Sequence, residues 1–317
     1  MHDPVAEAYS RLSGRVWHIK APAKINLRLK VLGRMEDGYH ALSMLNGSVS
    51  LFDEIKVAFV SDSSCEVQCS GSIDEEISSR DNLVTRAYTL FWRVCGYDTV
   101  PFGIQAEINK SIPTGGGLGG GSSDAAALLN FLVEKIGDVS RRSEDGSKSS
   151  LRSSIFREAV TLGADVPYAL QRGLCWVQGL GEVVQTVHYP HLADMDILIS
   201  VPRETVPTAA FYDFYRQSCS FEVGQVGRDE VMDALAEGAT CSIETVLIND
   251  FEPYIRQFRP LLGDVLDVAR SFFPLTSLTG SGSALFSLVD KGAKEQVSRY
   301  QKSASSLGVS VHKVKLL

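Results

Sequence analysis

The chain has 317 residues, enough for one large domain or two ordinary ones around sizeable cores. Its hydrophobic share of 44% and charged share of 22% are those of an ordinary globular protein. A net charge of −7 argues against a sequence-independent grip on nucleic acid, which needs a basic surface. No apolar run approaches the ~18 residues that a membrane span needs. We therefore expect neither a nucleic-acid nor a membrane partner.

The cysteines and the first residues indicate the compartment. Six cysteines are scattered without a C-x-x-C pair, which argues against a structural zinc site. Scattered thiols in a chain of this length are typical of reduced, buried side chains in a cytoplasm. The opening "MHDPVAEAYSRLSG" lacks the apolar region of a signal peptide. A cytoplasmic location is expected.

Periodicity predicts helices and strands that alternate along the chain. In the first half we expect a short helix at 5–12, strands at 16–33, 47–60, 63–71 and 102–113, a turn at Asp37-Gly38, and helices at 81–96, 122–137 and 155–163. The serine-rich stretch 138–154 is predicted to be a surface loop. In the second half we expect strands at 194–202, 277–290 and 309–317, and helices at 208–215, 242–258 and 260–273. The predicted class is α+β.

Six glycines occupy the seven positions from Gly115 to Gly121, directly before a predicted helix that Ser122 or Ser123 can cap. Ordering so many glycines costs conformational entropy, which is reasonable where a ligand must approach the backbone closely. Backbone amides of such a loop, with a helix N-terminus behind them, can hold phosphate. The two serine hydroxyls could serve phosphate or Mg²⁺, and Asp124 should point away from phosphate or act through the metal.

The glycine loop fits three alternative roles less well. A flexible linker is usually polar on both sides, whereas this loop joins an alternating strand to an apolar helix. A dinucleotide motif is satisfied by Gly115, Gly117 and Gly120, but Pro113 interrupts the approach and Glu134 lies inside the helix. A Walker loop requires G-K-[ST] at the helix entry, which this sequence lacks.

Two further segments carry candidate chemistry. "APAKINL" places Lys24 and Asn26 on one face of a strand, and "LGADVPYAL" places Asp165 just before Pro167. Each has an ordinary interpretation, Lys24 as a solvated strand lysine and Asp165 as a capping or turn aspartate. Together with the glycine loop, the two segments form one recognisable pattern.

"PAKINL", "GYH", "IPTGGGLGGGSSDAA", "GADVP" and "LTGSGSALF", in this order, resemble the GHMP kinase superfamily. The resemblance implies a two-domain α+β fold with the active site in the interdomain cleft. The proline-containing connection at Pro190, before a new apolar strand, predicts a division into 1–190 and 191–317. It also implies ATP as phosphoryl donor with Mg²⁺. The implied acceptor is a small molecule, the 2-hydroxyl of diphosphocytidyl methylerythritol. A kinase for another small alcohol, or a non-catalytic nucleotide-binding module, stays as an alternative.

The resemblance also implies site residues. Asp165 is the expected base and Lys24 its charged partner. Asn82 and Lys110 are the expected neighbours of the adenine. The expected ATP contacts are Asn82, Lys110, Pro113, Thr114, Gly115, Gly116, Gly117, Leu118, Gly119, Gly120, Gly121, Ser122 and Ser123. Tyr39 and His40 are expected at the cytosine of the acceptor. The expected acceptor contacts are Asn26, Tyr39, His40, Thr208, Gly280, Ser281 and Gly282. The relative weight of proton removal by Asp165 and of hydroxyl activation by Lys24 is left open.

Overall fold

The computed structural model describes residues 3–36, 38–71, 81–140, 148–192, 194–219, 224, 226–237, 239 and 241–317. The chain forms two compact units, each assembled from three segments. The first unit consists of Met1–Ala23, Leu51–Ile112 and Gly119–Gln171, and the second of Lys24–Ser50, Pro113–Leu118 and Arg172–Leu317. The sequence boundary near residue 190 falls inside the second unit, and the division into 1–190 and 191–317 stays a prediction.

A seven-stranded sheet has the strand order β3-β4-β2-β1-β8, with β5 paired to β2 and β6 to β5. Its strands are β1 (Val16–Arg34), β2 (His40–Val60), β3 (Cys65–Gly71), β4 (Gly103–Lys110), β5 (Leu174–Gly179), β6 (Val183–Thr186) and β8 (Ile248–Asn249). The strands β1 to β4 confirm the sequence predictions, although β2 begins at His40, seven residues earlier than predicted. The pair β5–β6 was not predicted from the sequence.

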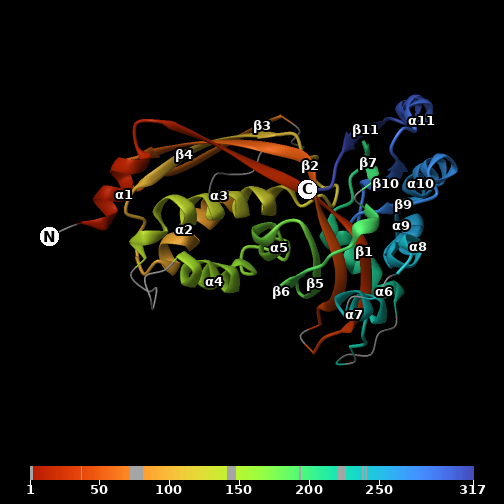
Figure 1. Ribbon diagram of the computed structural model, residues 1–317, viewed down its shortest axis with the longest axis horizontal. Coiled ribbons are helices and arrows are strands. Elements are labelled where there is room, and N and C mark those ends of the chain that lie inside the picture. Colours follow the sequence, from red (N-terminus) through yellow and green to blue (C-terminus); the bar gives the residue numbers. More distant parts are fainter. Residues whose placement is uncertain are drawn as a thin grey trace. The chain divides into compact units, whose positions relative to one another are not determined.

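The helices of the first unit lie on one side of β3 and β4 and share one hydrophobic core with them (Figure 1). They are α1 (Pro4–Leu12), α2 (Leu83–Val94), α3 (Gly120–Ile136), the short 3₁₀ turn η1 (Gly137–Val139), α4 (Lys148–Ala159) and α5 (Val166–Gln171). The indole of Trp92 is at the centre of this core, with the rings of Tyr88, Tyr97 and Phe102 edge-on around it. The Tyr97 hydroxyl donates to the carbonyl of Val139, so this aromatic cluster lies beside the C-terminal end of α3.

Two local predictions in this unit were wrong. Helix α3 begins at Gly120 with Gly119 as its N-cap, so neither Ser122 nor Ser123 caps it. Gly119 has a φ of +68°, which lets the chain turn from the loop directly into the helix. The predicted loop 138–154 is helical from Lys148, because Leu151 is buried in the core. Residues 141–147 of that stretch, like Asp37 of the predicted turn, lie outside the described residues.

The second unit contains a four-stranded antiparallel sheet in the order β11-β7-β10-β9. Its strands are β7 (Met195–Pro202), β9 (Thr276–Leu278), β10 (Leu285–Asp290) and β11 (Val309–Val314). The remaining elements are η2 (Pro190–Leu192), α6 (Thr208–Ser218), α7 (Glu230–Ala236), α8 (Ile243–Val246), α9 (Glu252–Phe258), α10 (Pro260–Phe272) and α11 (Lys294–Ser306). Helix α10 packs against β9, and α11 packs against β11. The sequence predictions for β7, α6 and α10 are confirmed, whereas α7 and α11 were missed.

The predicted helix 242–258 is interrupted by β8, which pairs in parallel with Arg28 and Leu29 of β1. The guanidinium of Arg28 donates to the carbonyl oxygens of Thr245 and Val246 at 3.1 and 3.2 Å, and forms a buried bidentate ion pair with Asp229. A continuous helix would use those two carbonyls itself. Tertiary hydrogen bonds therefore override the local helical pattern.

Residues 48–50 of β2 join the last residues of the chain. Val49 pairs with Leu316, the amide of Ser50 donates to the carbonyl of Lys315, and the amide of Leu317 donates to the carbonyl of Ser48. Both hydrogen bonds are 2.9 Å long. Opposite ends of the second unit's sequence are thus tied together.

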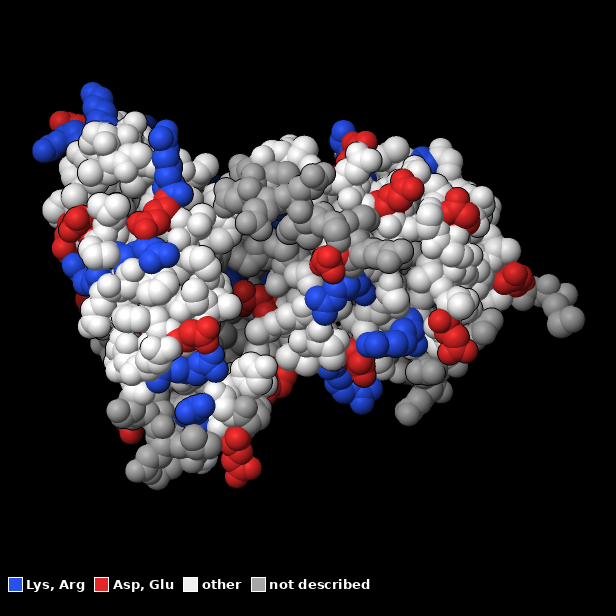
Figure 2. All heavy atoms as spheres, turned by 180° about the vertical axis from the view of Figure 1, so that it is seen from behind, with Lys and Arg blue, Asp and Glu red and all other residues white. Residues whose placement is uncertain are grey.

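The six cysteines are free thiols, and Cys95 and Cys175 are fully buried whereas the other four are half-buried. No helix in the described part of the chain is long and apolar enough to cross a membrane. Figure 2 shows acidic and basic side chains interspersed on one face of the molecule. Among the described residues on that face, no extended basic region is visible.

Candidate functional site

In the first unit, a buried lysine lies between two carboxylates where the glycine loop begins and ends. Lys110, the last residue of β4, has its Nζ 2.5 Å from Asp53 Oδ2 and 2.7 Å from Asp124 Oδ2. The second oxygen of Asp53 accepts the amides of Ser111 and Ile112 at 2.6 and 2.8 Å. Asp53 thus binds the two residues that directly precede Pro113 and the glycine loop, and Lys110 links Asp53 to the second turn of α3.

This triad, Asp53–Lys110–Asp124, is electrostatically unusual because its three side chains are at most 7% exposed. Burial raises the pKa of Asp124 to about 7, although the Lys110 ammonium opposes this shift. Burial alone would lower the pKa of Lys110, but the two carboxylates outweigh it and raise that pKa. Asp124 Oδ1 is buried without a hydrogen-bond partner. The Asp124 carboxylate is therefore directed at the Lys110 ammonium in the interior of the first unit.

Asn82 and Lys110, the two expected neighbours of adenine, both lie near the Cys69 thiol. Asn82 caps α2 by accepting the amide of Val84, and its Nδ2 donates to Cys69 Sγ at 3.4 Å. Burial raises the pKa of Cys69, and the charge of Lys110 opposes that shift. The Lys110 ammonium is paired with two carboxylates. Its contact with adenine stays a prediction.

The exit of the glycine loop approaches the "GADVP" segment within the first unit. A side chain placed at Gly163 would lie 3.7 Å from Ser122 Oγ. Asp165 follows in the turn before α5, half-buried, and its carbonyl accepts the amide of Ala169. Ser123 points elsewhere, since its hydroxyl donates to the carbonyl of Pro22 at 2.6 Å.

The N-terminus of α3 has no side-chain cap, because its N-cap residue is Gly119. The first amides of a helix lack partners within the helix and carry the positive end of its dipole. In a helix of 17 residues this end suits an anion. Gly121 at this end is exposed, and Gly119, Gly120 and Ser122 are half-buried.

In the second unit, Lys24 belongs to a buried polar cluster on β1 and β2. Its Nζ donates to Asn26 Oδ1 at 2.7 Å, and Asn26 Nδ2 donates to Asn46 Oδ1 at 2.6 Å. Lys24 is 7% exposed and Asn26 is fully buried, so Lys24 is not a solvated strand lysine. A buried ammonium and two carboxamides on adjoining strands indicate a functional site rather than an ordinary core.

Both glycine-rich segments meet beside this cluster. The amide of Lys24 donates to the carbonyl of Leu118 at 2.9 Å, and the amide of Ala284 donates to the carbonyl of Gly116 at 3.2 Å. Gly117 has a φ of +75°, and a Cβ there would lie 2.3 Å from the carbonyl oxygen of Thr279. Only glycine fits this close approach. Gly280 and Gly282 also have positive φ, and Ser281 between them is buried.

The residues expected at the acceptor base lie next to an aromatic cluster. Tyr39 is 65% exposed, whereas His40 is buried with its ring 5.3 Å from that of Tyr215 and 6.1 Å from that of Tyr212. Burial, with Arg34 and Arg216 nearby, lowers the pKa of His40 below its usual value. Thr208 is exposed at the first turn of α6, the helix that carries both tyrosines.

The structure thus gathers the expected residues into two groups. The first unit contains Asn82, Lys110, Asp165 and the loop exit from Gly119 to Ser123. The second unit contains Lys24, Asn26, Tyr39, His40, Thr208, the loop entrance from Pro113 to Leu118 and the segment Gly280–Gly282. The pairing of Lys24 with Asp165 stays a prediction. In the described chain no group of three or more His, Cys, Asp or Glu side chains could hold a metal ion.

Comparisons with known proteins decide the family. The GHMP kinases N terminal domain matches residues 82–173. A protein of Syntrophotalea carbinolica named 4-diphosphocytidyl-2-C-methyl-D-erythritol kinase is 32% identical over 86% of this chain and 89% of its own length. The chain belongs to the GHMP kinase family. Members of this family are ATP-dependent small-molecule kinases, so the chain is an enzyme of that class.

Solved structures confirm the fold of this GHMP kinase. The crystal structure of a 4-(cytidine 5'-diphospho)-2C-methyl-D-erythritol kinase matches with a TM-score of 0.67 at 29% identity, covering 94% of this chain and 99% of that one. A homoserine kinase from Cytophaga hutchinsonii has the same TM-score at 17% identity, with 96% of each chain covered. The predicted two-domain α+β fold is confirmed. Because both folds match equally well, the fold alone does not distinguish acceptors.

Several residues of this GHMP kinase site were missed from the sequence. Asp53 is in phase with the buried Ile55 and Val57 of β2, so a carboxylate at an inward position was a usable signal. Asn46 and Thr279 gave no such signal in the sequence, because a polar residue in a strand or loop has many ordinary roles. Their position is known only from the hydrogen bonds of the folded chain.

Proposed function

We propose that this GHMP kinase transfers the γ-phosphoryl group of ATP to the 2-hydroxyl of 4-diphosphocytidyl-2-C-methyl-D-erythritol, with Mg²⁺. The observation that carries the proposal is the 32% identity to a relative of that name over nearly the whole chain. The Lys24–Asn26 pair beside the glycine loop supports it, because a non-catalytic descendant is expected to lose the lysine or the Asp165 carboxylate, and this chain has both.

On the donor side, the uncapped start of α3 and the loop amides suit the ATP phosphates. Mg²⁺ prefers oxygen ligands and is usually held by few protein groups together with phosphates and water. The Ser122 hydroxyl, half-buried at the start of α3, is an oxygen donor of the right kind. Bound there, the ion would neutralise charge on the phosphates.

For the chemical step, we assign proton removal from the acceptor hydroxyl to Asp165. Phosphoryl transfer depends mainly on positioning and charge stabilisation. The Lys24 ammonium, held by Asn26 in a site with little water, can stabilise both the developing alkoxide and the transferred group. Phosphorylation of the hydroxyl releases ADP.

On the acceptor side, we assign the cytosine base to Tyr39 and His40. The exposed Tyr39 ring can stack on a base, and the lowered pKa of His40 keeps its imidazole neutral near pH 7. A neutral imidazole both donates and accepts a hydrogen bond, so it can recognise a base edge. Thr208, exposed on α6, is assigned to the same substrate.

The proposal is tested by coupled ADP release with a panel of alcohols: the diphosphocytidyl alcohol, mevalonate, homoserine and galactose. We expect turnover with the diphosphocytidyl alcohol far above that with the other three. Preference for another member of the panel would assign the chain a different acceptor. ATP binding without turnover of any alcohol would favour a nucleotide-binding module.

Gly117→Ala should raise the KM for ATP by at least about tenfold. An L-residue in the left-handed region costs ~1–2 kcal/mol, and 1.4 kcal/mol is about tenfold in affinity. The added Cβ would also collide with the Thr279 carbonyl oxygen. Gly116→Ala is the matched control, because its Cβ would meet only ordinary contacts at 3.5 Å, and its effect should be much smaller. Equal KM values in the two variants would contradict the close packing of the loop.

Tyr39→Ala should raise the KM for the acceptor by about tenfold or more, since stacking of a base on an aromatic ring contributes ~1–3 kcal/mol. The KM for ATP should barely change. Initial-rate kinetics with each substrate varied in turn measure both constants. A rise in the KM for ATP alone would move Tyr39 to the donor side.

A further inference from the structure

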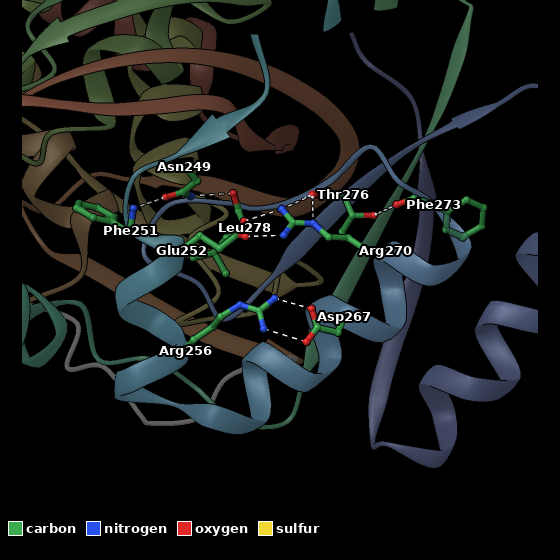
Figure 3. A network of polar contacts seen from close by, with 9 residues as sticks. All are labelled: Asn249, Phe251, Glu252, Arg256, Asp267, Arg270, Phe273, Thr276 and Leu278. Atoms are coloured by element: carbon green, nitrogen blue, oxygen red, sulfur yellow. Dashed lines mark hydrogen bonds and ion pairs between the residues drawn. The ribbon is translucent and has the colours of Figure 1, made fainter. Parts of the chain in front are cut away.

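Asn249 makes buried polar contacts within the second unit, and Figure 3 shows those with Phe251 and Leu278. This β8 residue is 5% exposed. Its Nδ2 donates to the carbonyl oxygens of Leu278 and Gly280 at 2.9 and 3.0 Å, and its Oδ1 accepts the amide of Phe251 at 2.9 Å. Two donors and one acceptor in this arrangement are what a carboxamide supplies. Asn249 therefore holds the backbone on both sides of residue 279.

Thr279, the residue between these two carbonyls, contacts the catalytic cluster directly. Its side chain is fully buried, and its Oγ1 accepts the amide of Asn26 at 3.0 Å. The same hydroxyl lies 3.3 Å from Asn26 Oδ1 and 3.4 Å from the carbonyl oxygen of Gly117, so its single proton can serve either acceptor. Asn26 Oδ1 in turn accepts from Lys24 Nζ at 2.7 Å.

We infer that Asn249 is a positioning residue for phosphoryl transfer, acting through Thr279 and Asn26 on the Lys24 ammonium. The inference rests on the proposed function, because it presumes that Lys24 acts in the reaction. Every contact in this relay lies within the second unit and is buried. The backbone of Thr279 itself donates to the carbonyl of Ala284 and accepts the amide of Gly282, both at 3.0 Å. Without the Asn249 carboxamide, the residues on both sides of Thr279 lose the hydrogen bonds from their carbonyls that complete this support.

The expected consequence is kinetic. A lysine that stabilises the transition state must be placed accurately, and a misplacement of about 1 Å can cost ~10²-fold in rate. Removal of an interaction made only in the transition state lowers kcat and kcat/KM equally. We therefore expect Asn249→Ala to lower kcat by about 10- to 100-fold while both KM values change by less than about threefold.

A matched control separates positioning from general destabilisation. Thr276 is buried on β9, three residues before Thr279, and its hydroxyl bonds to the Phe273 carbonyl and to Ser287 Oγ at 2.6 and 2.7 Å. These partners lie away from the loop that carries Thr279. Thr276→Val should lower the unfolding temperature as Asn249→Ala does, but leave kcat within about twofold of wild type.

The deciding measurement is a double-mutant cycle with Lys24→Met, using the alcohol of the panel that the wild type phosphorylates. If Asn249 acts through Lys24, Asn249→Ala should change kcat by less than about twofold in the Lys24→Met background. An equal loss of kcat in both backgrounds, or no loss in wild type, would overturn the inference. Wild-type turnover with the panel tests the proposed function separately from these ratios.

A second pair of variants keeps the test decisive if Asn249→Ala does not fold. Thr279→Ser keeps the hydroxyl that bonds to Asn26, and Thr279→Val replaces it with a methyl group of similar size. We expect Thr279→Val to lower kcat by about 10- to 100-fold and Thr279→Ser to stay within about threefold of wild type. Equal kcat values for the two variants would overturn the inference.

Discussion

Asp165→Asn is expected to lower kcat by ~10²–10⁴-fold, the usual contribution of a positioned general base. The substitution keeps the size of the side chain but removes its capacity to accept the hydroxyl proton. Asp165 lies in a turn, half-buried, so the fold should tolerate an amide there. The affinity for ATP should stay near that of wild type. Steady-state ADP release measures kcat, and equilibrium titration measures ATP binding.

The control for this prediction is the combination with Lys24→Met, which should itself be severely impaired. Residues that act as a unit show strongly non-additive losses. The double variant should therefore lose far less than the product of the two single losses. Near-normal turnover in Asp165→Asn would remove this carboxylate from the mechanism. Fully multiplicative losses would mean that the two residues act independently.

Asp53→Ala is expected to destabilise the protein by about 3–5 kcal/mol, the usual effect of removing one partner of a buried ion pair. The substitution leaves the Lys110 ammonium with Asp124 alone and orphans the amides of Ser111 and Ile112. Because those two residues directly precede the glycine loop, the KM for ATP should also rise. Urea unfolding measures the loss of free energy.

The matched control is Glu54→Ala, at the adjacent exposed position of the same strand. Surface substitutions usually change stability by no more than about 0.5 kcal/mol. Asp53→Asn should be intermediate, because its amide oxygen can still accept a backbone N–H. A loss below about 1 kcal/mol in Asp53→Ala would mean that the triad adds little to stability.

The sequence predicted the fold class and most long elements because their periodicity was strong. Helix α2, with Asn82 as its cap, and the alternating strand β4 were recognisable locally. Lys110 continues the inward phase of β4, as Asp53 does in β2, so two buried charges on neighbouring strands could have predicted an ion pair. Patterns of burial thus carried functional information that composition did not.

Other features depended on contacts between distant segments. Residues 242–258 have the pattern of one helix, but pairing of Ile248 and Asn249 with β1 interrupts it. The start of α3 moved to Gly120 because a left-handed glycine begins the helix, whereas local preferences favoured a serine cap. Asn249 and Thr279 are separated by 30 positions and become a relay only in the folded unit. No local signal distinguishes such residues from ordinary polar ones.

The bridge between residues 48–50 and 315–317 has a consequence for biosynthesis. The Ser50 hydroxyl accepts the Lys315 amide across a sequence separation of 265 residues. Closing so long a loop is entropically costly, and contacts of this kind slow folding. The second unit cannot complete this pairing until the ribosome has synthesised residue 317. During translation, residues 48–50 of β2 are therefore synthesised long before the backbone groups with which they pair.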